Sequence, residues 1–169
     1  MKPAKLAAVL GSDAIGREAR SVLEDHSAVR LWLRLLSCST QIEQEIRTRL
    51  RQRFATTLPR FDYLAQLERH PEGLRMKQLG SYLMVSGGNV TGLTDQLEAE
   101  GFVQRLPDPE DRRSWILQLT AQGRSHFLGM AAEHEAWLIE LLGGFEGANR
   151  LYELLGQLRV HLAQPENKA

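Results

Sequence analysis

The segment from Ser21 to Arg53 constrains the fold most, because neither glycine nor proline interrupts it. Apolar residues recur along it at steps of three and four, the period of one face of an α-helix. They are Ala28, Trp32, Leu35, Leu36, Ile42, Ile46 and Leu50. We therefore predict a helix of about thirty residues, which exceeds the diameter of a small domain. An apolar stripe of this length indicates a partner helix.

The rest of the chain predicts further helices and a hairpin. Thr57 and Pro59 mark a helix start, and Pro71 and Gly73 mark its end at about residue 70. Further helices are expected at 75–85, 86–101, 121–142 and 146–162, and strands at 102–106 and 114–119. Three helices followed by a two-stranded hairpin are the order of a winged helix-turn-helix, so the fold class is mainly α.

The helix expected at 86–101 has two different faces. Its inward stripe is Val90, Leu93 and Leu97, and its outward face carries Gly88, Gly92 and Asp95, flanked by Asn89, Thr91 and Gln96. Two outward glycines let the backbone approach another surface, and Asn, Thr and Gln suit base edges and phosphates. Ser86 caps the helix, whose first N–H groups favour a phosphate. A merely solvated face would favour Lys, Glu and Ala, so this face indicates DNA contact.

Composition limits the other function classes. Twenty-one basic and 21 acidic side chains give a net charge of zero, so any DNA binding must use a local patch. The single cysteine, Cys38, excludes an internal disulfide and a multi-thiolate zinc site. No apolar run approaches the ~20 residues of a membrane helix, and we expect a cytoplasmic protein. No phosphate loop, nucleophile elbow or carboxylate pair indicates an enzyme, a cofactor or a metal site.

The text LMVSGGNVTGLTDQLEAEGFVQRLPDPEDRRSWILQLTAQG, residues 83–123, resembles the MarR family of bacterial transcriptional regulators. The most specific part is DRRSWILQLTAQG, which matches the family's Asp-x-Arg wing followed by Leu-Thr-x-x-Gly. The resemblance covers about 21–162 in layout and about 74–123 in motif. It implies a homodimer whose first and last helices pack together, bound to double-stranded DNA at a pseudo-palindromic operator with half-sites about one helical turn (~34 Å) apart.

This layout divides the chain into four predicted parts. They are an N-terminal arm at 1–20, a dimerisation and effector helix at 21–56, a winged DNA-binding domain at 57–120 and C-terminal dimerisation helices at 121–169.

The charged turn at 107–113 becomes the wing tip in this resemblance. In the family, the Asp at the position of Asp111 orients the Arg at the position of Arg113, and wing arginines enter the minor groove, whose negative potential attracts them. Arg112 is the expected direct contact. The acids Asp108, Glu110 and Asp111 would position arginines and sharpen the turn. An ordinary salt-bridged hairpin is the alternative reading of Asp111 and Arg113.

The outward helix face departs from the family pattern. Members often carry a basic residue where this chain has Gly92, and Asp95 adds an acid to the same face. Sequence preference should therefore depend more on Asn89, Thr91 and DNA shape than on an arginine in this helix.

The first two helices also resemble the MarR branch of aromatic-acid catabolism, including regulators of hydroxycinnamate use, some of which respond to an acyl-CoA thioester. The family's effector pocket lies between the long helix and the winged module. The residues expected there are Trp32, Phe61 and Tyr63, with His26, Arg30 and Arg34 as polar partners. Core packing is the alternative for Trp32 and Phe61, and a solvated pair is the alternative for the two arginines.

A basic cluster ends the first long helix, at Arg47, Arg49, Arg51 and Arg53. Such a cluster can bind DNA phosphates or the phosphates of CoA. The alternative is a solvated helix face with no ligand. We expect Arg47 and Arg51 to help bind a thioester effector.

The sequence therefore predicts a repressor that an aromatic acid or its CoA thioester releases from DNA. One rival is a winged-helix module that makes only protein contacts. A second is a redox-sensing regulator that uses Cys38, although an inert buried thiol is the simpler reading.

Overall fold

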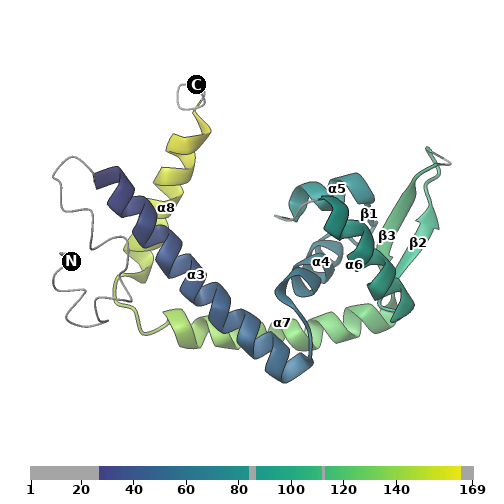
Figure 1. The fold of residues 1–169 in the computed structure, drawn as a ribbon, viewed down its shortest axis with the longest axis horizontal. Helices are drawn as coiled ribbons and strands as arrows, with labels where there is room; N and C mark the ends of the chain where they lie inside the picture. Colours follow the sequence, from purple (N-terminus) through teal and green to yellow (C-terminus); the bar gives the residue numbers. More distant parts are fainter. Residues whose placement is uncertain (1–26, 84–86, 112, 165–169) are drawn as a thin grey trace. The chain divides into compact units, whose positions relative to one another are not determined.

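The computed structural model describes residues 27–83, 87–111 and 113–164 (Figure 1). The chain divides into two compact units, Met1–Leu58 and Pro59–Ala169. Within the described ranges, the first unit consists mainly of one helix, and the second contains the small sheet and the remaining helices. The expected arm at 1–20 lies outside the described residues, as do His26, Ser86 and Arg112.

Helix α3 (Ser27–Phe54) is the long uninterrupted helix that the sequence predicts. Leu50, near its end, is fully buried, whereas Trp32, near its start, is 60% exposed. The helix ends where Ala55 adopts a left-handed φ of 50°, and the N–H of Thr56 donates to the carbonyl of Leu50 at 3.4 Å. The N–H of Ala55 donates to the carbonyl of Arg51 at 3.1 Å, and this bond from a residue in the left-handed conformation is the αL ending of a helix.

The second unit follows the order that the sequence predicts for a winged helix-turn-helix. Its elements are α4 (Leu58–Arg69), α5 (Met76–Tyr82), α6 (Gly87–Ala99), β2 (Val103–Pro107), β3 (Trp115–Leu119) and α7 (Ala121–Leu142). An additional strand, β1 (Leu74–Arg75), pairs antiparallel with β3 and gives the sheet order β1-β3-β2. The sequence prediction missed β1, because two residues are too few to show an alternating pattern.

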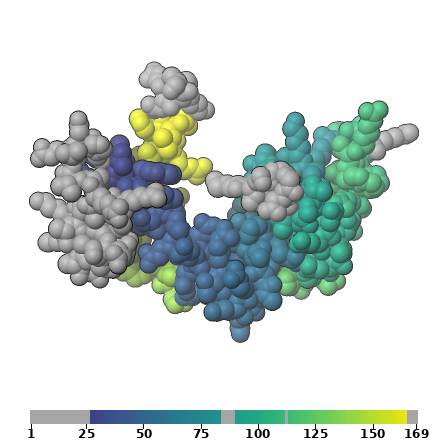
Figure 2. Space-filling view, viewed as in Figure 1, coloured from purple at the N-terminus to yellow at the C-terminus, as the bar shows by residue number. Residues whose placement is uncertain are grey.

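The hairpin of β2 and β3 projects from the body of the second unit (Figure 2). Arg105 lies opposite Leu117, and Pro107 lies opposite Trp115. Residues directly opposite in an antiparallel pair share a face, and Leu117 and Val103 on this face are buried. Arg105 therefore occupies a position in the inward row of the hairpin.

The core of the second unit draws on every helix and strand of the winged module. Its most completely buried side chains are Tyr63, Leu64 and Leu67 from α4, Leu79 from α5, Val90 and Leu97 from α6, Val103 and Leu117 from the hairpin, and Met130 from α7. Truncating one of these leucines to alanine should cost about 2–5 kcal/mol.

The Leu-Thr-x-x-Gly motif joins three elements at the start of α7. Thr120 Oγ1 accepts from the N–H of Gly123 at 2.9 Å and donates to the carbonyl of Gly101 at 2.6 Å. A Cβ atom at Gly123 would lie only 1.9 Å from the carbonyl oxygen of Phe102. Gly101 ends α6 with a φ of +76°, which favours glycine. The motif therefore fixes the end of α6 against the base of the hairpin and the start of α7.

Helix α8 (Ala148–Ala163) begins two residues after the predicted start at 146 and has no buried residue. Its exposed apolar side chains are Leu151, Tyr152, Leu154, Leu155, Val160 and Leu162. The end of α7 adds Ile139, Leu141 and Leu142, which are also exposed. None of the helices in the described ranges has the length and apolar character required to cross a membrane.

Candidate nucleic-acid interface

Helix α6 presents the two faces that the sequence predicts. Val90, Leu93 and Leu97 are buried, whereas Thr91, Gly92, Asp95 and Gln96 are exposed. A Cβ atom at Gly92 would meet nothing within 4 Å, so the backbone there is open to an approaching surface. Gly88 and Asn89 lie in the first turn of this helix, and Ser86 lies just outside the described residues.

The acids of α6 are paired with arginines from neighbouring elements. Arg105 on β2 bonds to Asp95 through Nη2 and to Glu98 through Nη1, each at 2.5 Å. Hydrogen bonding to Asp95 raises the pKa of Arg105, against the opposing effect of burial. The negative charge of Asp95, which departs from the family pattern, is therefore compensated within the domain.

A second arginine approaches the end of α6 from another element. Arg60 on α4 forms an ion pair with Glu100, just beyond the end of α6. The same guanidinium lies 3.5 Å from the side-chain oxygen of Gln96, so Gln96 is exposed but already has a partner. Arg60 thus connects α4 to the C-terminal end of α6.

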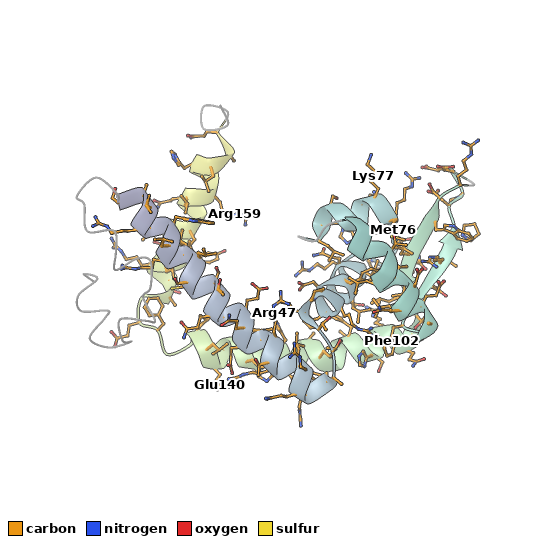
Figure 3. All side chains as sticks on the ribbon, in the orientation of Figure 1. Arg47, Met76, Lys77, Phe102, Glu140 and Arg159 are labelled. Carbon is orange, nitrogen blue, oxygen red and sulfur yellow. The ribbon has the colours of Figure 1, made fainter. Side chains whose placement is uncertain are left out.

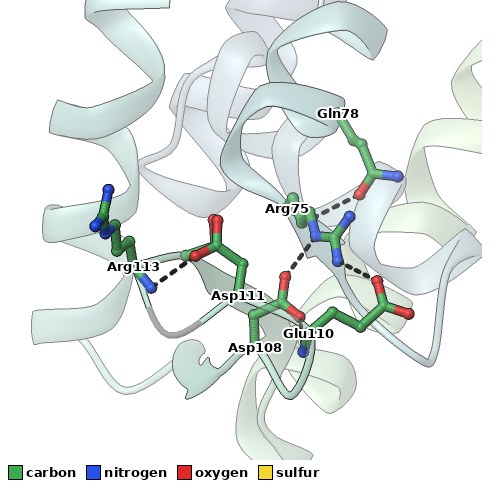
Figure 4. Close-up of polar contacts among 7 residues, drawn as sticks. Arg75, Gln78, Asp108, Glu110, Asp111 and Arg113 are labelled. Atoms are coloured by element: carbon green, nitrogen blue, oxygen red, sulfur yellow. Dashed lines mark hydrogen bonds and ion pairs between the residues drawn. The ribbon is translucent and has the colours of Figure 1, made fainter.

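The base of the wing is organised around the buried carboxylate of Asp108 (Figure 4). Arg75 donates to Asp108 through Nε at 2.5 Å and to Glu110 through Nη2 at 2.7 Å. Asp108 also accepts from the N–H of Glu110 at 2.9 Å. The guanidinium of Arg75 is the main cause of a lowered pKa of Asp108, and the backbone N–H adds to the effect. These contacts fix the turn to the start of α5, where the N–H of Arg75 donates to Gln78.

Asp111 shapes the wing turn by a route that differs from the prediction. One carboxylate oxygen accepts from the backbone N–H of Arg113 at 3.0 Å, and the other accepts from the hydroxyl of Ser114 at 2.8 Å. The same two bonds lower the pKa of Asp111. The expectation that Asp111 orients the Arg113 side chain is therefore wrong in this structure, since its oxygens bind the backbone of the turn and Ser114. The Arg113 side chain is exposed.

The expected aromatic slot residues of the second unit are packed in its core. Phe61 is 6% exposed, and its ring lies 5.4 Å from that of Phe127 and 4.6 Å from that of His134. Burial lowers the pKa of His134. Tyr63 is fully buried and its hydroxyl lies 2.7 Å from that of Thr94. The prediction that Phe61 and Tyr63 line an open slot is therefore wrong, because both side chains are buried. The alternative of core packing holds for Phe61.

The other expected effector residues lie on α3 in the first unit. Trp32 is exposed, and Arg30 and Arg34 are partly exposed. Arg47, shown in Figure 3, is exposed and bonds to Glu43 one turn earlier, through Nε at 3.0 Å. Arg51 is also exposed.

Helical ion pairs offset part of the basic cluster at the end of α3. Besides the pair of Arg47 with Glu43, Arg49 pairs with Glu45 at 2.7 Å. The cluster is thus less positive than its arginines alone suggest. Cys38 is exposed on the same helix, which contradicts the expectation of a buried thiol.

The sequence analysis did not predict three basic residues of the module as site residues. Arg75 and Arg105 hold the wing, and Lys77 projects outward from α5 (Figure 3). Arg105 could have been noticed because it lies two residues after the inward Val103 and therefore puts a charge on the inward face of the strand. Arg75 had no such signal, because its acidic partners follow more than thirty residues later. Among the described residues, no group of three or more His, Cys, Asp or Glu side chains is arranged to hold a metal ion.

Comparison with known proteins agrees with this geometry. The model of the MarR family matches residues 56–115. The chain is 34% identical over 122 residues to the transcriptional activatory protein BadR of Rhodopseudomonas palustris, covering 70% of this chain and 69% of that protein. It is also 34% identical over 106 residues to the regulator PecS of Dickeya dadantii, covering 60% of this chain and 64% of PecS.

A solved structure extends the agreement to the fold. The crystal structure of a MarR family transcriptional regulator from Silicibacter pomeroyi is 31% identical, with a TM-score of 0.68 over 81% of this chain and 94% of that one. The transcriptional regulator BldR of Sulfolobus solfataricus has the same fold, with a TM-score of 0.71 at 23% identity. The chain therefore belongs to the MarR family of DNA-binding transcriptional regulators.

Proposed function

We propose that the protein is a homodimeric, sequence-specific repressor that binds a pseudo-palindromic operator and is released by an aromatic acid or its CoA thioester. The observation that carries the DNA-binding part is the exposed face of α6. Thr91 and Gly92 are exposed on this face, Gln96 is exposed beside Arg60, and the acid Asp95 is paired with Arg105.

The two parts of the module would read different grooves. With α6 in the major groove, Gly92 lets the backbone approach the DNA, and Asn89 and Thr91 supply short hydrogen-bonding groups for base edges and phosphates. The wing then carries Arg112 and Arg113 to the adjacent minor groove. The turn is held through the backbone N–H of Arg113 and the hydroxyl of Ser114, which leaves the Arg113 side chain exposed.

The apolar surface of the last helix supports a dimer of two copies of this chain. Helix α8 buries none of its residues, although six large apolar side chains line it. The start of α3 exposes Val29, Leu31 and Trp32 as well. An interface that covers such helices would bury above ~2,000 Å², the size of an obligate dimer.

Support for the effector rests on α3 alone. Trp32 offers an exposed indole, and Arg30 and Arg34 lie near it in sequence, one turn apart from each other. A free carboxylate needs one cation beside an aromatic surface. A CoA thioester brings several negative charges, for which Arg47 and Arg51 are the candidate partners. We propose repression because a dimer bound to a promoter blocks RNA polymerase without needing a surface that contacts the polymerase.

Selection of duplexes from a random pool tests the DNA-binding proposal. The expected result is an enriched pseudo-palindrome with half-sites about one helical turn apart, bound with a steep salt dependence. A module for protein contacts would select no duplex and show no such dependence. Transcription from a promoter carrying the enriched site should fall when the protein is added, and a rise would replace repression by activation.

Release titrations test the effector proposal. Paired aromatic acids and their CoA thioesters are added to the protein–DNA complex, with the parent and two variants. Arg30→Gln should raise the concentration of free acid needed for release. The double variant Arg47→Ala, Arg51→Ala should raise only the concentration of thioester. Release by free acids and thioesters alike, with a normal response in the double variant, would remove the phosphate-binding role. Cys38→Ser tests the redox alternative and should respond as the parent does.

A further inference from the structure

Helix α6 has an unusual charge for a DNA-facing helix. Between Gly87 and Ala99 it contains no lysine or arginine, but it contains Asp95 and Glu98, and Glu100 follows directly. DNA carries one negative charge per ~1.7 Å of its axis, so uncompensated acids on this helix would oppose binding. The C-terminal end of a helix also disfavours acids, because of the helix dipole.

The structure supplies the missing positive charge from the hairpin. Arg105 is 24% exposed at its side chain and reaches both carboxylates, while Asp95 remains 60% exposed. Asp95 and Glu98 lie three residues apart and so share one side of the helix. A guanidinium presents parallel N–H groups in a rigid fork, which matches two carboxylates placed in this way.

The position of Arg105 also links the helix to the wing. It lies in the inward row of the hairpin, opposite the buried Leu117. Only Leu106 and Pro107 separate it from Asp108, which anchors the wing turn through Arg75. The contact between Arg105 and α6 is therefore made on the strand that leads directly to the wing tip.

We propose that Arg105 is a positioning residue for DNA recognition, which masks the acids of α6 from DNA phosphates and holds the wing in register with this helix. The inference rests on the proposed DNA-binding function. Arg105 is not assigned a contact with DNA, because both of its terminal nitrogens bond within the domain, Nη2 to Asp95 and Nη1 to Glu98. Asp95 and Glu98 are the partners of Arg105. Their negative charge is therefore compensated without a lysine or arginine in α6 itself.

A double-mutant cycle separates this role from a direct phosphate contact. The four proteins are the parent, Arg105→Gln, the pair Asp95→Asn with Glu98→Gln, and the triple variant, each titrated with the selected operator over a range of salt. Arg105→Gln should weaken binding roughly tenfold or more in the parent background and much less when the acids are already neutral. An equal loss in both backgrounds, with the salt slope reduced by about one unit, would overturn the proposal in favour of a phosphate contact.

Two further variants control for folding and for charge. Arg124→Gln removes an equal charge and an ion pair in the same unit, but its partner is Glu68 of α4 and not an acid of α6, so operator affinity should stay close to that of the parent. Arg105→Lys retains the positive charge but not the fork, and should recover only part of the affinity that Arg105→Gln loses. Full recovery of operator affinity in Arg105→Lys would overturn the wing-positioning role. The only role left for Arg105 would then be to mask the charge of the acids.

Hydrogen exchange without DNA tests the positioning role independently of the proposed function. The amides of residues 103–119 should exchange faster in Arg105→Gln than in the parent and in Arg124→Gln. Unchanged exchange would contradict the link between α6 and the wing. If the parent protein selects no operator, the proposed function fails, whereas additive costs around the cycle with normal parent binding overturn only the assignment of Arg105.

Discussion

Tyr63 on α4 and Thr94 on α6 share a hydrogen bond of 2.7 Å between their hydroxyl groups, and both residues are fully buried. The Thr94 hydroxyl also lies 2.8 Å from the carbonyl oxygen of Val90. Burial raises the pKa of Tyr63 to about 12. A polar contact inside an apolar core thus connects α6 to α4.

Replacing Tyr63 with phenylalanine should destabilise the second unit at neutral pH by about 1 kcal/mol, the net value of one intramolecular hydrogen bond. The ring and its packing remain, so the loss reports the hydroxyl alone. Urea denaturation at pH 7 measures it. Tyr82→Phe, at a tyrosine that is 50% exposed, is the matched control and should change stability much less. Equal stability of the parent and Tyr63→Phe would show that the shared bond contributes nothing.

The same variant makes a prediction at alkaline pH. Tyr63 has a folded pKa of about 12 against an ordinary value of 10.0, so its neutral form is favoured in the folded protein. Its contribution to stability is complete below pH 10 and is lost as the pH rises towards 12. The stability difference between the parent and Tyr63→Phe should therefore shrink over this range. A difference that stays constant from pH 9 to pH 12 would contradict the assignment.

Asp111 and Arg113 should respond differently to alanine. Arg113→Ala retains the backbone N–H that Asp111 accepts, so the turn should persist. Operator affinity should then fall with a salt slope lower by about one unit, as expected for one phosphate contact. Asp111→Ala removes both side-chain bonds that Asp111 makes in the turn and should weaken binding without the loss of a cation. Titrations at several salt concentrations separate the two effects, and unchanged binding in both variants would remove the wing from the interface.

Asp108 should matter more to the wing than Glu110, although both bond to Arg75. The side chain of Asp108 is 1% exposed and that of Glu110 is 80% exposed. Asp108→Asn should loosen the hairpin and lower operator affinity about tenfold or more, because it breaks a buried charged contact. Glu110→Gln is the matched control and should have a small effect, since exposed ion pairs contribute little. Equal losses in the two variants would refute the central role of Asp108.

Acid denaturation provides a second readout for Asp108. Its lowered pKa means that its contribution to stability is present above the ordinary value of 3.8 and is lost as the pH falls through the folded value. The parent should therefore lose stability more steeply than Asp108→Asn below about pH 4.

All the predicted elements of the fold have a local signal, which the two-residue strand β1 lacks. The absence of Gly and Pro predicts α3, and Gly101 predicts the end of α6. The Leu-Thr-x-x-Gly motif predicts the start of α7, and the structure supplies its cause in the contact of Gly123 with Phe102. These signals depend on neighbours within a few residues, which a single sequence contains.

The partners of the wing could not be predicted in the same way. Arg75 and Asp108 are 33 residues apart, and nothing in the spacing of the sequence joins them. Phe61 fits an effector slot and a core equally well by residue type, and only its contacts with Phe127 and His134 decide between the two. Asp95 looked unfavourable on a DNA-facing helix until Arg105 was placed beside it.

Deleting residues from Leu151 onward should separate a dimeric protein from a monomeric one. Helix α8 buries none of its residues in a single chain, so a protein that works as a monomer would keep its fold without it. If α8 instead packs against a second copy, the deletion leaves the other apolar helices uncovered, and the shortened protein should be unfolded or aggregated. Circular dichroism and sedimentation of the parent, the shortened chain and the control Glu153→Gln make the comparison, and a well-folded monomer from the shortened chain would rule out the dimer.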